Sequence, residues 1–256
     1  MKKTFSSKKK SAFSLIELSI VLIIIGLLIA GITGGASLIK SSELRSVVVE
    51  ARVYASAVNN FFSRYNALPG DFATSLGSSD VVGNGNNQIR HFDSTVAEGA
   101  EALRDLQTIG AIDTTTLTLV ALSTTVPAMT VGTNFPVSKV KGSGWAFDYD
   151  TVSLQNVVAL TGNVAASTAT ASIVNGTVTS GVLSANTGTG ALLPSDVLSI
   201  DSKVDDGVPS AGKIRGYNSG SNLCTTVAGS GPYTYTYTVS ATTKTCILSY
   251  QVDVNS

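Results

Sequence analysis

The sequence predicts an α+β protein in which one long N-terminal helix, with a transmembrane first half, packs on an antiparallel β-sheet globular domain. Three observations predict this class. An apolar run extends over 27 residues from Phe13 to Ile39, an amphipathic pattern continues it, and the second half is rich in Thr, Val, Ser and Gly. Long apolar runs form membrane-crossing helices, whereas β-branched residues between Gly-rich turns form strands.

The charge of the chain is unevenly distributed. Charged residues make up only 13% of the 256 residues, about half the usual share, and the formal net charge is zero. Five of the 17 basic residues are lysines within the first ten positions, which leaves 12 basic against 17 acidic groups elsewhere. This composition excludes a basic nucleic-acid-binding domain and an acidic disordered chain.

Residues that carry catalysis or bind transition metals are scarce. The chain has one histidine, His91, and two cysteines, Cys224 and Cys246, too few for a four-ligand Cys/His site. His91 lies near a Gly/Asn-rich stretch, and no nucleophile elbow or phosphate-binding loop motif occurs. We therefore expect no enzymatic activity.

The apolar run from Phe13 to Ile39 is long enough to cross a membrane, at roughly 40 Å of helix. The lysines before it hold the N-terminus in the cytoplasm, so the rest of the chain is exported. A secretory signal cleaved near Gly34-Gly35-Ala36 and a plain membrane anchor are alternatives. The apolar run is too long for a secretory signal. A plain anchor explains the length but not Glu17, whose burial near a helix centre would cost about 2.5–3.5 kcal/mol.

The segment Ala12-Phe13-Ser14-Leu15-Ile16-Glu17, after the basic leader, resembles the class III signal of type IV pilins and type II secretion pseudopilins. The resemblance implies cleavage between Ala12 and Phe13 by a prepilin peptidase and methylation of the new Phe13 amine. Glu17 then occupies the fifth mature position, as in that family. The family usually has Gly before the cut, and Ala12 is expected to slow cleavage rather than abolish it.

Glu17 is the expected assembly residue. An ionised carboxylate in an apolar helix needs a partner, and cleavage creates the Phe13 amine. Four residues of helix separate the two by roughly 6 Å along the axis, so the amine of a neighbouring subunit fits better and would set the register of a filament. In the alternative, Glu17 reaches the lipid headgroups and pairs with nothing.

The helix is expected to continue past the membrane to Asn66 and to end at Ala67-Leu68-Pro69-Gly70. Its apolar stripe consists of Leu44, Val48, Ala51, Ala55, Val58, Phe62 and Tyr65. The opposite, polar face carries Glu43, Arg45, Glu50, Arg52, Asn59 and Arg64. The chain then divides into a basic leader (1–12), the transmembrane half of the helix (13–40), its amphipathic half (41–67) and an exported β-rich globular domain (68–256).

Local signals within the exported domain predict a turn, a short helix and several strands. A turn at Leu68-Pro69-Gly70-Asp71 precedes a loop at Gly83-Asn84-Gly85-Asn86-Asn87, and residues 98–109 form the helix. Alternating Trp145, Phe147 and Tyr149 mark one strand, and alternating tyrosines mark another. Residues 233–239 and 245–254 are expected to pair as a C-terminal hairpin.

Two further sites are expected in the exported domain. Cys224 and Cys246 suggest a disulfide, as the family commonly has in its C-terminal region, although two free thiols stay possible. Asp201, Asp205 and Asp206 form the densest acidic cluster. Some secretion pseudopilins bind calcium in such loops, so these oxygens are candidate Ca²⁺ ligands. The alternative is a strand that ends in an Asp-Asp-Gly turn, with no cofactor.

The resemblance implies a structural subunit that polymerises into a type IV pilus or a type II secretion pseudopilus. Its partners would be copies of itself, other pilins, the prepilin peptidase, the inner-membrane assembly platform and membrane lipid, with no nucleic acid. It would be anchored in the bacterial inner membrane, with its C-terminal domain in the periplasm, and would move into an extracellular pilus or a periplasmic pseudopilus on assembly. Alternatively, the chain is a minor pilin displayed on such a filament as an adhesin or uptake receptor.

Overall fold

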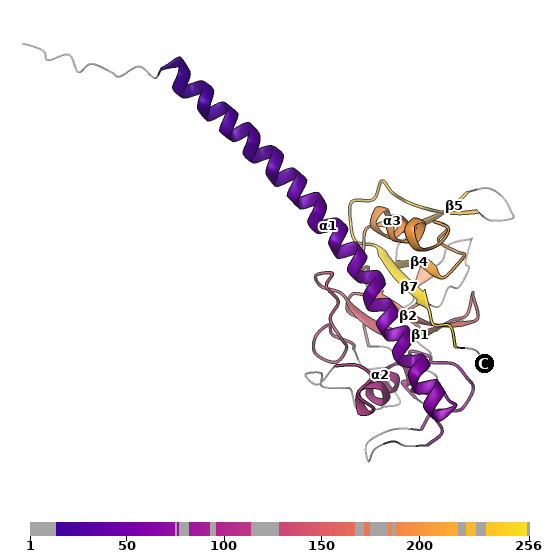
Figure 1. Ribbon diagram of the computed structural model, residues 1–256. Helices are drawn as coiled ribbons and strands as arrows, with labels where there is room; N and C mark the ends of the chain where they lie inside the picture. The colour runs from indigo at the N-terminus through magenta and orange to yellow at the C-terminus, as the bar shows by residue number, and fades with distance from the viewer. Residues whose placement is uncertain are drawn as a thin grey trace, which may run out of the picture. The chain divides into compact units, whose positions relative to one another are not determined.

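The computed structural model divides the chain into two compact units, residues 1–42 and 43–256 (Figure 1). The boundary falls inside the first helix, α1 (Leu15–Tyr65), which contributes to both units. The structure describes residues 14–74, 76, 82–92, 96–113, 128–166, 172–174, 184–185, 188–219, 224–228 and 234–254.

The first unit consists of the apolar part of α1. Among the described residues, α1 is the one helix long and apolar enough to cross a membrane, and no residue of its most apolar window is buried. Its large side chains are exposed throughout, from Leu15 at 86% to Ile39 at 72%. The helix α1 begins two residues after the predicted start, Phe13, and ends one residue before the predicted end, Asn66.

The second half of α1 forms part of the domain core, with its buried face rotated slightly from the predicted stripe. Val47, Ala57 and Phe61 are buried, whereas the expected Val48 and Phe62 are half-buried. Glu50 also lies toward the domain, contrary to the predicted polar face. The Trp145 indole N–H donates to Glu50 Oε2 at 2.7 Å, and the Ser138 hydroxyl donates to the same oxygen at 2.6 Å. Glu50 therefore fastens α1 to the first strand.

The turn and the Gly/Asn loop predicted after α1 are joined through Asp71, which is buried. The backbone N–H groups of Gly85 and Asn87 donate to its two carboxylate oxygens, each at 2.6 Å. Helix α2 (Glu98–Thr108), which confirms the predicted short helix, packs against Gly70. Gly70 has φ +79°, and a Cβ there would lie 2.1 Å from the Glu98 carbonyl oxygen, so this turn requires glycine.

The main sheet has five strands in the order β1-β2-β7-β4-β3. All neighbours are antiparallel except β3 and β4, which confirms the predicted α+β class. The strands are β1 (Gly144–Asp150), β2 (Gln155–Thr161), β3 (Ser184–Ala185), β4 (Ile214–Ser219) and β7 (Cys246–Gln251).

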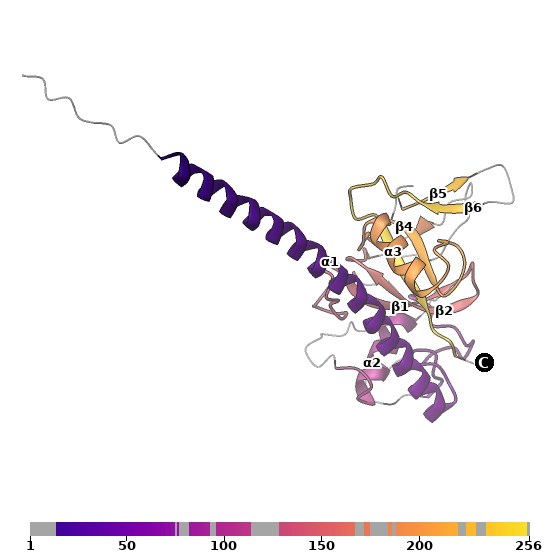
Figure 2. The same ribbon diagram turned by 45° about the horizontal axis from the view of Figure 1, so that its top comes forward.

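The predicted C-terminal hairpin is wrong. Strand β6 (Thr234–Tyr237) pairs with β5 (Thr225–Ala228) in a separate two-stranded sheet (Figure 2). Strand β7 lies between β2 and β4 (Figure 1). The first five residues of β7 are all buried. A strand buried in this way needs a neighbour along each edge and cover on each face, which a hairpin with β6 alone would not supply. Tyr233 of the expected strand lies outside the described residues.

The acidic cluster lies at the end of a helix and not of the predicted strand, because Asp201 is in its last turn and Asp205 and Asp206 follow it. Helix α3 (Pro194–Val204) begins with Pro194 in its first turn and buries Val197 and Ile200. Proline at the start of a helix and apolar residues three positions apart are helical signals.

Asp148 of β1 is a buried carboxylate that joins three distant segments. Its Oδ1 accepts the backbone N–H of His91 at 2.9 Å, and its Oδ2 accepts those of Ile173 and Val174 at 2.6 and 2.9 Å. The Ser172 hydroxyl and the Tyr149 N–H donate as well. A buried carboxylate with this many donors has its lone pairs satisfied without a cation.

Candidate functional site

The expected assembly residue Glu17 lies in the first turn of α1 and is exposed. Its Oε2 accepts the backbone N–H of Ser14 at 2.8 Å, while the Ser14 hydroxyl oxygen accepts the N–H of Ile16 at 3.4 Å. The carboxylate therefore satisfies one of the free N–H groups at the helix start and lies at the positive end of the helix dipole. The cleavage residues Ala12 and Phe13 lie outside the described residues.

The capping role of Glu17 was missed from the sequence, although a signal for it was present. Ser14 and Glu17 have the spacing of a capping box, in which a Glu three residues after a Ser accepts the backbone N–H of that Ser. No described residue donates to the other oxygen, Oε1. Glu17 thus has one oxygen engaged by its own helix and one available to another donor.

The two cysteines form a disulfide in the domain, with Cα atoms 4.9 Å apart. Cys246 opens β7 and Cys224 immediately precedes β5, and both are fully buried. Asn218 of β4 supports the bridge, because its side-chain oxygen accepts the N–H groups of Cys224 and Thr225 at 2.6 and 2.8 Å. The disulfide therefore ties the small β5–β6 sheet to the centre of the main sheet.

Loss of this disulfide, by replacing both cysteines with serine, is expected to lower the free energy of unfolding by roughly 3 kcal/mol, because the 22-residue loop gains freedom when unfolded. Guanidinium unfolding followed by the fluorescence of Trp145, the lone tryptophan, measures the change. Non-reducing peptide mapping of the wild type should show the two cysteine fragments linked. Two thiols that alkylate independently in the folded protein would contradict the pairing.

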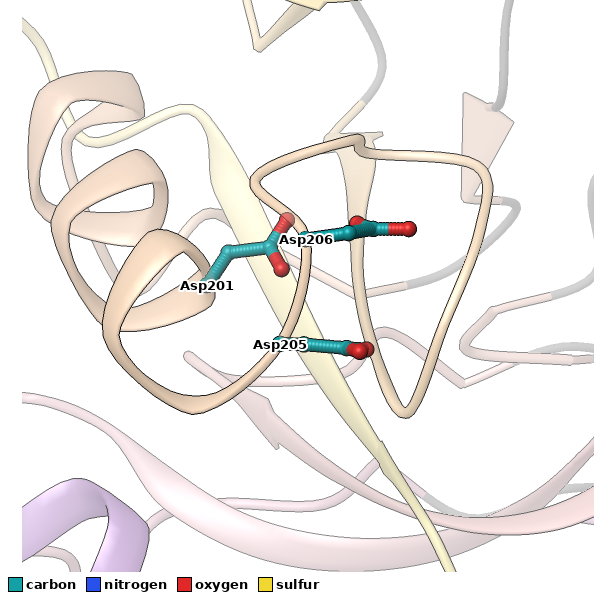
Figure 3. Close-up of side chains that lie close together, drawn as sticks. All are labelled: Asp201, Asp205 and Asp206. Atoms are coloured by element: carbon teal, nitrogen blue, oxygen red, sulfur yellow. The ribbon is translucent and has the colours of Figure 1, made fainter.

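The carboxylates of Asp201, Asp205 and Asp206 lie together, with oxygens within 4.8 Å of one another (Figure 3). Asp201 is buried on α3, while the other two are exposed on the loop that follows. Tyr237 of β6 donates to Asp201 Oδ2 at 2.7 Å. Burial raises the pKa of Asp201 to about 6, although its hydrogen bonds from Tyr237 and Gly207 act in the opposite direction.

Each of these carboxylates already shapes the turn. Asp201 accepts the N–H of Gly207, Asp206 that of Val208, and Asp205 those of Lys213 and Ile214. Backbone N–H groups already bind the three carboxylates, so the turn is held without an ion. Calcium binding at these aspartates stays a prediction. Calorimetric titration of Ca²⁺ checks it. Binding would give heat and a higher Tm, both lost when Asp205 and Asp206 become Asn, and no heat at millimolar Ca²⁺ would contradict it.

The single histidine, His91, is 1% exposed. No described residue is a hydrogen-bond partner of its ring nitrogens Nδ1 and Nε2. Burial lowers the pKa of His91, and the nearby charge of Asp148 offsets only part of this effect. The imidazole is therefore held neutral inside the domain, away from any substrate in solution.

The domain is expected to lose stability through His91 as the pH falls below about 6.5. Below that value His91 binds a proton in the unfolded chain but stays neutral in the folded protein. The free energy of unfolding therefore falls by up to about 1.4 kcal/mol per pH unit. Urea unfolding at pH 7.5 and 5.5, compared between wild type and His91→Leu, isolates this effect. Asp201 has the opposite effect on stability, because its raised pKa favours the folded state below about pH 6. Both proteins contain Asp201, so its effect cancels in the comparison. An equal pH dependence in the two would contradict the prediction.

Comparison with known families identifies the N-terminal segment. Residues 7–33 match the family described as the prokaryotic N-terminal methylation motif, and this range includes Ala12, Phe13, Ser14 and Glu17. No curated protein and no solved structure matches the chain. The match and the long apolar helix fit anchoring in a membrane before assembly. The matched segment is the prepilin-type signal of type IV pilins and pseudopilins, as the sequence resemblance implied.

Proposed function

We propose that the chain is a prepilin and that its function is structural. A prepilin peptidase removes residues 1–12 and methylates the Phe13 amine. The mature protein then polymerises, with copies of itself and other pilins, from the inner membrane into a type IV pilus or a type II secretion pseudopilus. The exported domain reaches the periplasm, and on assembly it covers the surface of the filament.

The observation that carries this proposal is Glu17. It is the only charged residue between Phe13 and Ile39, in a helix whose apolar window has no buried residue. A carboxylate at the centre of a membrane helix costs about 2.5–3.5 kcal/mol, and a plain anchor gains nothing from carrying one. A filament subunit gains a contact, because its Glu17 carboxylate can pair with the Phe13 α-amino group of a neighbouring subunit. This contact would set the axial register between the two subunits.

The geometry of Glu17 supports such a contact. Oε2 stays bonded to the Ser14 N–H of its own helix, and Oε1 faces no donor among the described residues. An incoming Phe13 amine can therefore bind Oε1 without breaking the cap. The ion pair would be formed in a medium of low dielectric, where charge-assisted hydrogen bonds are strong.

Mass spectrometry of the protein in sheared filaments tests the proposal. The expected N-terminal peptide begins at a methylated Phe13. A chain that begins at Met1 or Ser37, or one absent from filaments, would contradict it. Copy number separates the two roles, because a structural subunit dominates the filament, whereas an adhesin or uptake receptor is rare.

A further inference from the structure

A pocket of about 240 Å³ lies in the domain where the Gly/Asn loop meets the β1–β2 hairpin and the residues that follow β7. Its apolar part includes Leu68 and Val252, which are both buried. Most of its wall consists of uncharged polar side chains: Asn86, Asn87, Gln88, Tyr149, Gln155 and Asn156. Among the described residues, no charged side chain lines the pocket. The pocket is therefore polar without being ionic.

Several polar groups of this pocket are not used by the fold. The side-chain amides of Asn87 and Gln155 and the hydroxyl of Tyr149 have no hydrogen-bond partner in the part of the chain that the structure describes. Asn87 is exposed and the other two are half-buried, so all three can meet a ligand. Each amide offers one carbonyl acceptor and two N–H donors, and the phenol both donates and accepts.

The wall of the pocket is held in place by bonds that leave these groups open. Asn156 donates from Nδ2 to the backbone carbonyl of Asn87 at 3.1 Å. The Arg90 guanidinium lies over the Tyr149 ring, 5.6 Å from its centroid, and Arg90 Nε donates to Gln88 Oε1 at 2.8 Å. The polar side chains are thus positioned before a ligand arrives, which lowers the entropic cost of binding.

Two residues of the pocket have a strained backbone. Three non-glycine residues of the described chain have positive φ, and two of them, Asn87 at +60° and Leu154 at +57°, line this pocket. Leucine is unusual in the left-handed region because its Cβ is crowded there. Leu154 is also 66% exposed, so burial does not offset the strain. Strained residues of this kind cluster at ligand-binding sites, and Leu154 offers an apolar contact at the rim that the fold does not need.

We propose that this pocket binds the ring of a neutral hexose sugar. A charged ligand would lose its water without an opposite charge in the lining, and an apolar ligand would cover the amides without bonding to them. A sugar ring satisfies both parts of the lining, because its hydroxyls donate and accept hydrogen bonds while its C–H groups are apolar. The volume lies below the roughly 300–1,000 Å³ of pockets for drug-sized ligands, which suits a single ring. This inference goes beyond the structural role proposed above and does not depend on it.

Saturation-transfer NMR on the full chain in a sugar-free detergent tests the proposal, with D-glucose, D-galactose and D-mannose as probes. At least one hexose should receive saturation from the protein, with a Kd of about 1 mM, as expected for one ring held by a few hydrogen bonds. Cyclohexanol, a ring of the same size with a single hydroxyl, should receive none. No transfer to any of the three hexoses, or equal transfer to cyclohexanol, would overturn the proposal. Tighter binding of glucuronate than of glucose would also overturn it, because the pocket would then select an acidic ligand.

Asn87→Gly and Gln155→Ala test whether the pocket holds the sugar. Each variant loses one amide and should bind the hexose about 3- to 10-fold more weakly. Glycine adopts the positive φ of Asn87 freely, and Gln155 is only half-buried, so an unchanged Trp145 emission spectrum should show both variants folded. Gln107→Ala is the matched control, since Gln107 lies on α2 outside the pocket. Losses no greater than in this control would overturn the assignment.

Leu154→Gly separates binding from stability. The variant removes the strain at φ +57° and should unfold at the same urea concentration as the wild type or a higher one. It should nevertheless bind the hexose about fourfold more weakly, the effect of one buried methylene group. Unchanged hexose binding would show that Leu154 is not part of the site.

Discussion

Glu17→Gln should reach the membrane in normal amounts and be depleted at least about tenfold from sheared filaments. The amide oxygen of Gln can still accept the Ser14 N–H, as Glu17 Oε2 does at 2.8 Å, so the helix start keeps its cap. Only the charge is lost, and with it the partner of a neighbouring Phe13 amine. Hydrogen bonds to charged groups contribute about 1.5–3 kcal/mol, which corresponds to roughly 10- to 100-fold in assembly.

Quantitative immunoblots of membranes and sheared filaments measure this depletion. The variant must be the only copy of this protein in the cell, because a wild-type partner could mask the defect. Ser19→Ala is the matched control, since Ser19 lies in the same apolar segment and, among the described residues, its hydroxyl donates to the Ile16 carbonyl. Glu17→Ala should fail like Glu17→Gln, with membrane insertion intact. Normal amounts of Glu17→Gln in filaments would show that the charge does not guide assembly.

Asp148→Asn should destabilise the domain formed by residues 43–256 by about 3–5 kcal/mol. The substitution keeps the shape of the side chain but replaces one carboxylate oxygen with an NH₂ group. That NH₂ group then faces another donor, the backbone N–H of either His91 or Ile173. These buried N–H groups then lose their acceptor, and removing one partner of a buried charged network costs several kcal/mol. Because a domain is stable by only about 5–15 kcal/mol, the variant is close to unfolding.

Urea unfolding of the full chain in detergent, followed by Trp145 emission, measures the loss, since Trp145 is 1% exposed. Asp253→Asn is the control with the same chemical change. Asp253 is exposed and paired with Lys213, and exposed ion pairs contribute less than about 1 kcal/mol. Equal stability of the two variants would mean that Asp148 is dispensable.

The N-terminal part of the molecule was readable from the sequence, because its constraints are local. An apolar run, a basic leader and the offset from Phe13 to Glu17 are all defined by nearby residues, and the family match covers residues 7–33. The start and end of α1 followed from the same local patterns. The role of Ser14 was also local, and reading the Ser-x-x-Glu spacing would have predicted it.

The interior of the domain was not readable in this way. Asp148 was passed over because its donors come from segments about 57 and 25 residues away that carry no pattern. Helical periodicity places Glu50 on the polar face of α1. It cannot predict that the Trp145 indole, from a strand distant in the sequence, donates a hydrogen bond to Glu50. Strand β7 was paired with its nearest neighbour in the chain, whereas burial on both faces places it between β2 and β4.

The central position of β7 has a consequence for the order in which the sheet forms. Both strands that flank β7 precede it in the chain, so β2 and β4 have no common neighbour until Cys246–Gln251 arrives. A chain that emerges from its N-terminus supplies this segment after all its partners. Until then the sheet is split into two incomplete halves, β1–β2 and β4–β3. Because Cys246 opens β7, the covalent bond to Cys224 then locks the strand that completes the sheet.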